Sequence, residues 1–158
     1  MKKIIITIDG PAASGKGRIA KYICNKWKFK HLDSGILYRR LAKKILINNV
    51  NIKSTKEIKN IVFKQKNISF RKDKSLRTEE ISNMASKIAI YDFVREFINK
   101  FQRNFVYSKS TSKRFVIDGR DIGSVVFKKA DLKLYIDVNE KNRAKRRYKQ
   151  LIDTDEKS

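Results

Sequence analysis

A glycine-rich segment near the N-terminus has the residue spacing of a phosphate-binding loop. Residues 10–18 read GPAASGKGR and follow the apolar run 4–8 after a single residue, Asp9, so the loop begins where a buried strand ends. In the spacing G-x-x-x-x-G-K, the glycines let successive backbone N–H groups point at phosphate oxygens, and the lysine, here Lys16, reaches the β and γ phosphates. A turn that only joins a strand to a helix would need neither the second glycine nor the lysine. The segment therefore predicts a nucleotide phosphate as ligand.

One position departs from the usual pattern of this loop. The residue after Lys16 is Gly17, where a Ser or Thr hydroxyl usually binds Mg²⁺, and Arg18 comes next. This GKG form resembles the nucleoside monophosphate kinases, in which the hydroxyl residue usually comes one position later. Arg18 thus removes an oxygen ligand and adds a cation. The resemblance implies that ATP is bound by the residues of the loop, namely Gly10, Pro11, Ala12, Ala13, Ser14, Gly15, Lys16, Gly17 and Arg18.

The elements around the loop alternate between strand and helix patterns. Runs of β-branched and aromatic residues predict strands at 4–8, 29–32, 67–71, 114–118 and 132–138. Apolar residues three and four apart predict helices at 17–28, 36–48, 54–66, 78–90 and 92–109, and a basic helix from the cap Asn139 through Ile152. Strands that alternate with helices predict an α/β fold, a parallel sheet with helices on both faces.

The helix expected at 92–109 carries phenylalanines at strict four-residue spacing. They are Phe93, Phe97, Phe101 and Phe105. Such a stripe could be a platform for stacked bases or part of the core. We favour the core, because the stripe keeps the helical period and no basic residue interrupts it.

Three further segments join the loop in a larger resemblance. They are residues 33–39 (DSGILYR), 77–103 (RTEEISNMASKIAIYDFVREFINKFQR) and 118–127 (DGRDIGSVVF). With the loop they resemble the bacterial cytidylate kinases from residue 4 to about residue 151. The resemblance implies a single P-loop nucleoside monophosphate kinase domain over 1–158, with an acceptor-binding region at about 34–109. It also implies transfer of the γ-phosphoryl group of ATP, accompanied by Mg²⁺, to CMP or dCMP.

The resemblance also implies roles for single residues. Ser86, Arg95 and Asp121 fall on positions that read cytosine, whose amine donates to a carboxylate and whose ring nitrogen and carbonyl accept from arginine or hydroxyl. Ser34, Arg39 and Arg120 fall on positions expected to bind the acceptor ribose or phosphate. Guanidinium groups bind phosphate in bidentate fashion. The catalytic residues implied are Lys16 and Arg120, which would neutralise the charge of the transferring group.

Simpler interpretations remain open for several of these residues. Asp121 could pair with Arg120 or cap a turn, and Ser86 could serve helix packing. Arg95 could lie on a solvated helix face. Asp33 could organise Mg²⁺ through water or cap the next helix, so no metal ligand is assigned.

The chain departs from the resembled family in two regions. The segment between Phe70 and Arg77 is short where the family usually inserts a small β-rich subdomain over the acceptor. After Leu151 the family continues with an arginine-rich lid, a strand and a helix, whereas the sequence stops at Ser158, so we expect a C-terminally incomplete fold. Two other functions follow from these departures and from the charge: a nucleotide-binding remnant with little turnover, and a basic RNA-binding protein.

The composition is strongly basic. Lys and Arg number 39 against 16 Asp and Glu, a formal net charge of +23. The lysines are spread along the chain, which favours a general residue bias over a nucleic-acid surface, and the basic run 143–147 is typical of a solvated helix face. No signal peptide or membrane span is recognisable. We therefore expect a cytoplasmic monomer whose partners are ATP and CMP or dCMP, rather than a membrane or nucleic acid.

Overall fold

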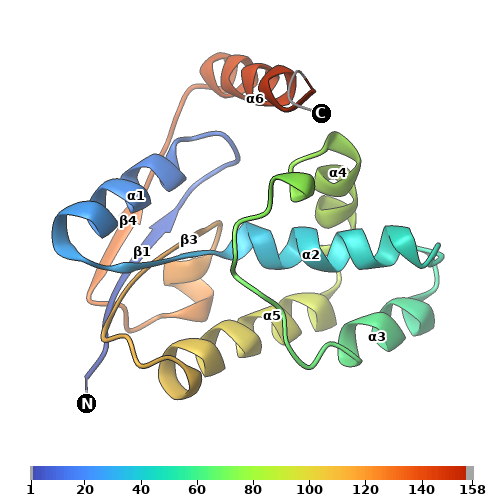
Figure 1. Cartoon of the computed structure of the whole chain (residues 1–158), viewed down its shortest axis with the longest axis horizontal. Helices are drawn as coiled ribbons and strands as arrows, with labels where there is room; N and C mark the ends of the chain where they lie inside the picture. Colours follow the sequence, from blue (N-terminus) through green and yellow to red (C-terminus); the bar gives the residue numbers. More distant parts are fainter. Residues whose placement is uncertain (1, 156–158) are drawn as a thin grey trace.

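A parallel four-stranded sheet organises the N-terminal and C-terminal parts of the chain. The computed structural model describes residues 2–155. Its strands are β1 (Ile4–Asp9), β2 (Lys30–Asp33), β3 (Arg114–Gly119) and β4 (Leu132–Tyr135), in the order β2-β3-β1-β4. Every pairing is parallel, so all four strands end at the same edge of the sheet (Figure 1). This confirms the predicted α/β fold with a parallel sheet.

Helices make up most of the rest. The α-helices are α1 (Lys16–Trp27), α2 (Ser34–Ile47), α3 (Thr55–Phe63), α4 (Glu79–Ile88), α5 (Asp92–Asn104) and α6 (Glu140–Asp155). Short turns of other helical types are η1 (Lys74–Leu76), η2 (Phe105–Lys109) and η3 (Ile122–Val126). No helix among residues 2–155 is long and apolar enough to cross a membrane.

Both faces of the sheet are covered, as the alternation of side chains along β1 requires. Ile5 points to one face, where it packs with Phe115 and with residues of η2 and η3. Ile8 points to the other face, where it packs against Ala20 and Ile23 of α1. The predicted helices on both faces are confirmed.

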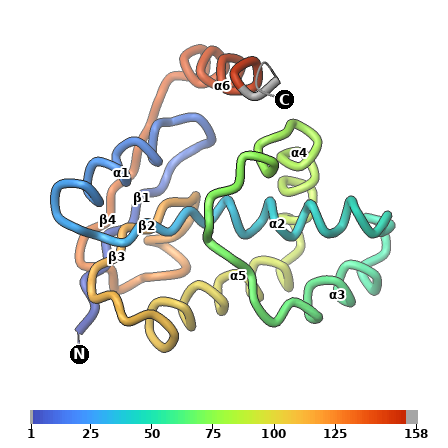
Figure 2. The backbone as a smooth tube through the Cα atoms, in the orientation of Figure 1, coloured from blue at the N-terminus to red at the C-terminus, as the bar shows by residue number. Residues whose placement is uncertain are grey.

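The helices that connect β2 to β3 in the sequence form a second core. Figure 2 shows helices α2 to α5 grouped beside the sheet. They pack around buried aliphatic side chains. Of the predicted phenylalanine stripe, Phe93, Phe97 and Phe101 pack against this core and are half-buried, whereas Phe105 packs against the core beside η2 and η3. The face of α5 that is fully buried carries Val94, Ile98, Asn99 and Gln102.

The connection after α3 differs from the prediction. Residues 67–71 form no strand, and the side chain of Arg40, rather than a neighbouring strand, binds two of their carbonyl groups. Its guanidinium donates to the carbonyl oxygens of Ser69 at 2.9 Å and Arg71 at 2.7 Å.

Several predicted boundaries also move. The second helix begins at Ser34, directly after β2, and the third ends at Phe63. The helix expected to reach 109 ends at Asn104, where η2 begins. The strand expected at 132–138 ends at Tyr135, and η3 was not predicted. The predicted cap of α6 is confirmed, since Asn139 Oδ1 accepts from the backbone N–H of Lys141 at 2.9 Å.

Candidate nucleotide and acceptor site

The phosphate loop joins β1 to α1 in the geometry its sequence predicts. Gly10 has φ of 150° and Gly15 has φ of 97°, conformations that side chains rarely allow. A Cβ atom on Gly10 would lie 2.3 Å from the carbonyl oxygen of Ile136, the residue after β4. Helix α1 begins at Lys16, so its free N–H groups face the space enclosed by the loop. The side chain of Arg18 is exposed on the first turn of this helix.

Lys16 lies against the loop and is surrounded by charged groups of the sheet edge. Its ammonium group donates to the carbonyl oxygens of Gly10 at 2.8 Å and Pro11 at 2.6 Å. Burial lowers the pKa of Lys16, the charge of Asp118 opposes this, and Arg120 lowers the pKa further. The structure thus brings together the two residues expected to be catalytic, Lys16 and Arg120.

Two carboxylates stand side by side where β2 and β3 end. Asp33 and Asp118 are in register across these strands. Burial raises the pKa of Asp33 and the charge of Asp118 raises it further, whereas Arg39 at 3.3 Å and His31 lower it. His31 also contacts the carboxylate of Asp118 at 3.2 Å. Among the side chains of residues 2–153, no group of three or more His, Cys, Asp or Glu is arranged to hold a metal ion.

Asp9, the last residue of β1, holds the segment that follows β3. Its two carboxylate oxygens accept from the backbone N–H groups of Ile122 at 2.7 Å and Gly123 at 2.8 Å. The segment between β3 and η3 contains Arg120 and Asp121, so Asp9 fixes the point at which this segment ends. Sequence reasoning missed this residue. Its place between strand and loop is visible in the sequence, but its partners are not.

The residues expected to hold the acceptor phosphate gather at the start of α2. Ser34 is buried at the first position of the helix, and Arg39 follows just over one turn later. The Nε atom of Arg39 is buried and has no hydrogen-bond partner in the described part of the chain. Burial lowers the pKa of Arg39; Asp33 raises it, and the charges of Arg77 and Arg147 lower it again. Arg39 therefore offers a free donor among several cations.

The residues expected to read cytosine lie on three different elements. Burial raises the pKa of Tyr38 to about 12, the charge of Asp121 raises it and that of Arg95 lowers it. Asp121 and Arg95 are therefore close to the same phenol, which sequence reasoning did not single out. Ser86 lies exposed on α4 and donates to the carbonyl of Ser82 at 3.2 Å.

The structure supports the simpler interpretation of Arg95 but not an ion pair between Arg120 and Asp121. Arg120 and Asp121 form no ion pair within residues 2–155. Arg95 is exposed on α5. It donates to Asp92, the first residue of that helix, and to the carbonyl oxygen of Ala89 at 3.2 Å.

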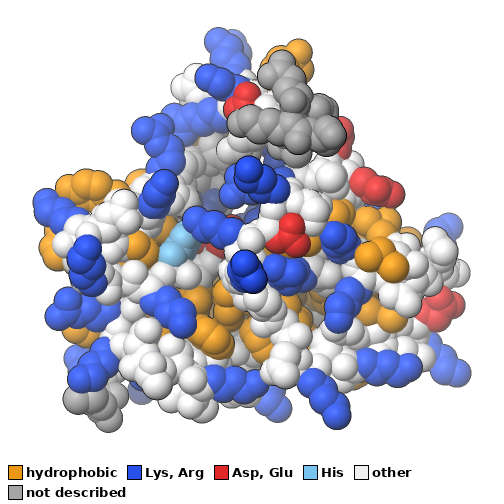
Figure 3. Space-filling model, viewed as in Figure 1, with side chains coloured by type: hydrophobic (Ala, Val, Ile, Leu, Met, Phe, Trp, Pro, Cys, Tyr) orange, Lys and Arg blue, Asp and Glu red, His pale blue; other side chains and the backbone are white. Residues whose placement is uncertain are grey.

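Helix α6 lies beside the phosphate loop. Arg146 donates to the carbonyl oxygen of Ser14 at 3.2 Å. A cavity of about 300 Å³ separates the loop from the helix. It is lined by Ala12, Ala13, Glu140, Arg143, Ala144 and Arg147. Lysine and arginine side chains are abundant over the face of the molecule in Figure 3, as the composition predicts.

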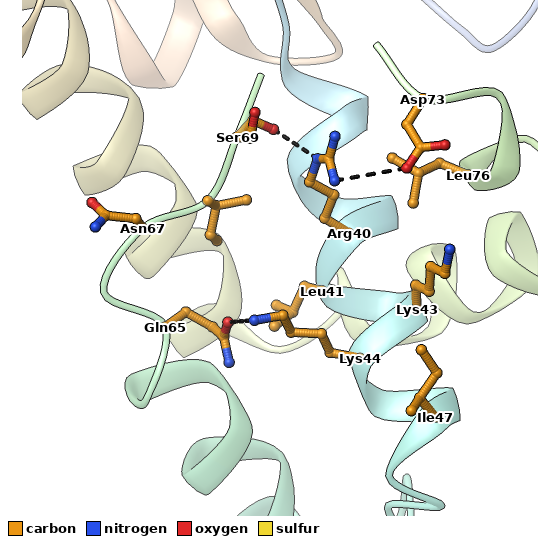
Figure 4. Close-up of a pocket in the computed structure, with 11 residues that line it drawn as sticks. Arg40, Leu41, Lys43, Lys44, Ile47, Gln65, Asn67, Ser69, Asp73 and Leu76 are labelled. Atoms are coloured by element: carbon orange, nitrogen blue, oxygen red, sulfur yellow. Dashed lines mark hydrogen bonds and ion pairs between the residues drawn. The ribbon is translucent and has the colours of Figure 1, made fainter. Parts of the chain in front are cut away.

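A second cavity, of about 350 Å³, lies away from the loop, between α2 and the connection 64–77. Figure 4 shows cations of α2 reaching across it: Lys44 donates to Gln65 and Arg40 lies 3.9 Å from Asp73. Lys43 donates to Ser75 at 2.9 Å. These contacts hold the connection 64–77 against α2. None of the predicted site residues lines this cavity.

The parallel sheet, the loop after β1 and the arginines facing it define a P-loop nucleotide-binding protein of the α/β class. The cytidylate kinase family model matches residues 6–158. The chain belongs to the cytidylate kinase family.

Curated relatives agree with this assignment. The chain is 40% identical over 156 residues to the cytidylate kinase of Bartonella tribocorum, covering 96% of this chain and 69% of the relative. It is 36% identical over 163 residues to the cytidylate kinase of Fusobacterium nucleatum, covering 97% of this chain and 72% of the relative. It is 39% identical over 146 residues to the cytidylate kinase of Rickettsia africae, covering 92% of this chain and 64% of the relative. A crystal structure of TT1252 from Thermus thermophilus aligns with a TM-score of 0.49 and 17% identity, covering 96% of this chain and 78% of that one.

Proposed function

We propose that this protein transfers the γ-phosphoryl group of ATP to CMP or dCMP, giving ADP and CDP or dCDP. The observation that carries the proposal is the arrangement of three cations around Asp33 and Asp118 at the edge of the sheet where the phosphate loop lies. Arg39 lies 3.3 Å from Asp33, the charges of Asp33 and Asp118 act on both Arg39 and Lys16, and Arg120 acts on Lys16. Two polyanions must be held in line for phosphoryl transfer, and most of the catalysis is positioning and charge neutralisation. These three cations offer both.

The donor half of the site is the phosphate loop. The backbone N–H groups of residues 10–18 and the start of α1 would bind the β and γ phosphates of ATP. Lys16 would exchange the carbonyl oxygens of Gly10 and Pro11 for phosphate oxygens, and would stabilise the charge of the transferring group. No covalent intermediate is needed.

The acceptor half lies on α2, α4, α5 and the segment after β3. Arg39, with its free buried donor, and Arg120 would bind the acceptor phosphate, and Ser34 the ribose or phosphate. Asp121 would accept from the cytosine amine, while Arg95 and Ser86 would donate to its ring nitrogen and carbonyl. The nearness of Asp121 and Arg95 to Tyr38 supports this grouping.

The residues present fit a Mg²⁺ ion that enters with ATP. Asp33 and Asp118 are hard oxygen ligands, and the pKa of Asp33 is raised first by burial and then by the charge of Asp118, both of which a bound cation would offset. Bound Mg²⁺ would neutralise charge on the β and γ phosphates. Arg18 has no hydroxyl to offer the ion, and its exposed cation lies on the same helix turn.

A coupled assay of ADP release tests the proposal. We expect turnover with CMP and dCMP above that with UMP or AMP, and we expect Lys16→Met to lower kcat by about 10²-fold or more. Lys21→Met is the matched control, since Lys21 is exposed on the same helix. No turnover with any pyrimidine monophosphate would contradict the proposal. Arg18 favours a second candidate, a nucleotide-binding protein without turnover, and calorimetry with ATP and CMP would distinguish it.

A further inference from the structure

Two adjacent arginines of α6 reach to different parts of the molecule. Arg146 donates to the carbonyl oxygen of Ser14 in the phosphate loop, and Arg147 donates to Ser82 Oγ on α4 at 3.0 Å. Successive residues point about 100° apart around a helix, so neighbours can face different partners. Helix α6 therefore contacts both the donor loop and the acceptor helix, above which it lies in Figure 1.

The contact with Ser82 has a defined geometry. The hydroxyl of Ser82 donates its proton to the carbonyl of Thr78 at 2.9 Å, which leaves its oxygen free to accept from Arg147. Ser86 follows one turn later and donates to the carbonyl of Ser82. Residues four apart lie on one face of a helix. Arg147 thus binds the face of α4 that presents Ser86.

The same arginine also faces the phosphate side of the site. Arg147 lines the cavity of about 300 Å³ with Ala12 and Ala13 of the loop. Its charge acts on Arg39, whose pKa it helps to lower. Arg143, one turn earlier, lies 3.7 Å from Glu140, whereas no acidic side chain among residues 2–153 forms an ion pair with Arg147. Arg147 therefore lies next to both the donor region and the acceptor region.

We propose that Arg147 is a positioning residue that acts through Ser82 to couple nucleotide binding at the phosphate loop to CMP binding at α4. The inference rests on the function proposed above. A nucleotide in the cavity would fix α6 against the loop, and the contact from Arg147 to Ser82 would then fix α4 with Ser86 in place. Such coupling is reciprocal, so each ligand raises the affinity for the other by the same factor.

Calorimetry on the full chain tests this coupling without turnover. CMP affinity is measured with and without a non-hydrolysable imido analogue of ATP, for wild type, Arg147→Met, Ser82→Ala and the double variant. We expect the analogue to raise CMP affinity about tenfold in wild type and less than about twofold in each variant. The double variant should show no further loss, because both changes remove one contact. Arg147→Lys, which keeps a donor, should recover part of the effect.

Lys145→Met is the matched control. It removes the same charge from the same helix at an exposed position on another face, and should leave the coupling at the wild-type factor. Thermal unfolding of each variant checks that the fold is kept. Full coupling in Ser82→Ala together with loss in Arg147→Met would overturn the proposal, as would unchanged coupling in both. A wild-type chain that binds neither ligand would overturn the proposed function as well, whereas an active wild type with uncoupled sites would overturn this inference alone.

Discussion

The carboxylate of Asp9 lies 2.8 Å from the backbone nitrogen of Gly123 and accepts its hydrogen bond. Its other oxygen accepts from Ile122, so one side chain at the end of β1 satisfies two consecutive buried N–H groups. The phosphate loop starts at the residue after Asp9, and the segment with Arg120 and Asp121 ends where η3 begins. Asp9 therefore joins the donor loop to the acceptor segment.

Replacing Asp9 by Asn should destabilise the fold. The amide keeps one acceptor oxygen but places an NH₂ group against a buried N–H donor, and a buried donor without a partner is costly. We expect a loss of about 3 kcal/mol in the free energy of unfolding, measured by urea denaturation. Asp137→Asn, at an exposed position, is the control and should change stability by less than about 0.5 kcal/mol. Equal stability of the two variants would show that the Asp9 contacts contribute little.

A methyl group at Gly10 should disrupt the phosphate loop. The Cβ of Gly10→Ala would meet the carbonyl oxygen of Ile136 at 2.3 Å, and φ of 150° is unfavourable for alanine. We expect a loss of about 2 kcal/mol or more in stability and weaker binding of an ATP analogue. Gly17→Ala is the steric control for stability, since its Cβ would meet Asp118 at 3.8 Å, an ordinary contact. Wild-type stability and analogue affinity in Gly10→Ala would contradict this view of the loop.

Stability at high pH should depend on Tyr38. Its pKa is about 12 in the folded protein, against 10.0 for an ordinary tyrosine, so between these values the unfolded chain loses a proton that the folded chain keeps. The free energy of unfolding therefore falls as pH rises through this window, by about 1.4 kcal/mol per pH unit at most.

Tyr38→Phe should lack this part of the pH dependence. Urea denaturation at about pH 9.5 and about pH 11 should show wild type losing about 1 kcal/mol more than the variant. Tyr148→Phe, at an exposed position, should behave as wild type. Parallel pH profiles for wild type and Tyr38→Phe would show that the phenol titrates normally.

The buried amide of Gln102 should cost stability. Gln102 on α5 is fully buried, and neither its nitrogen nor its oxygen has a hydrogen-bond partner in the described part of the chain. Gln102→Met keeps the shape without the polar atoms, so we expect a gain of about 1 kcal/mol in the free energy of unfolding. Gln102→Glu, which would bury a charge, should instead destabilise. Destabilisation by Gln102→Met would indicate that the amide is hydrogen-bonded in solution.

The sequence predicted the elements whose signals are local. The apolar run before the loop, the spacing of Gly10 and Lys16, and the helical period after them are contained in a few consecutive residues, and the structure has strand, loop and helix there. Residues 67–71 show the limit of local signals. Their composition suits a strand, but Arg40 of α2 binds the carbonyl groups of Ser69 and Arg71, and nothing local indicates that partner.

The sequence by itself determined the phosphate loop, the α/β class and which residue types could bind two nucleotides. Only the tertiary structure decided the strand order β2-β3-β1-β4 and which side chains meet. Asp9 and Ile122 are 113 residues apart, and Arg147 and Ser82 are 65 apart. Such contacts form because the packed sheet and helices bring distant segments together. A local pattern of residue types contains no information about which distant segment that will be.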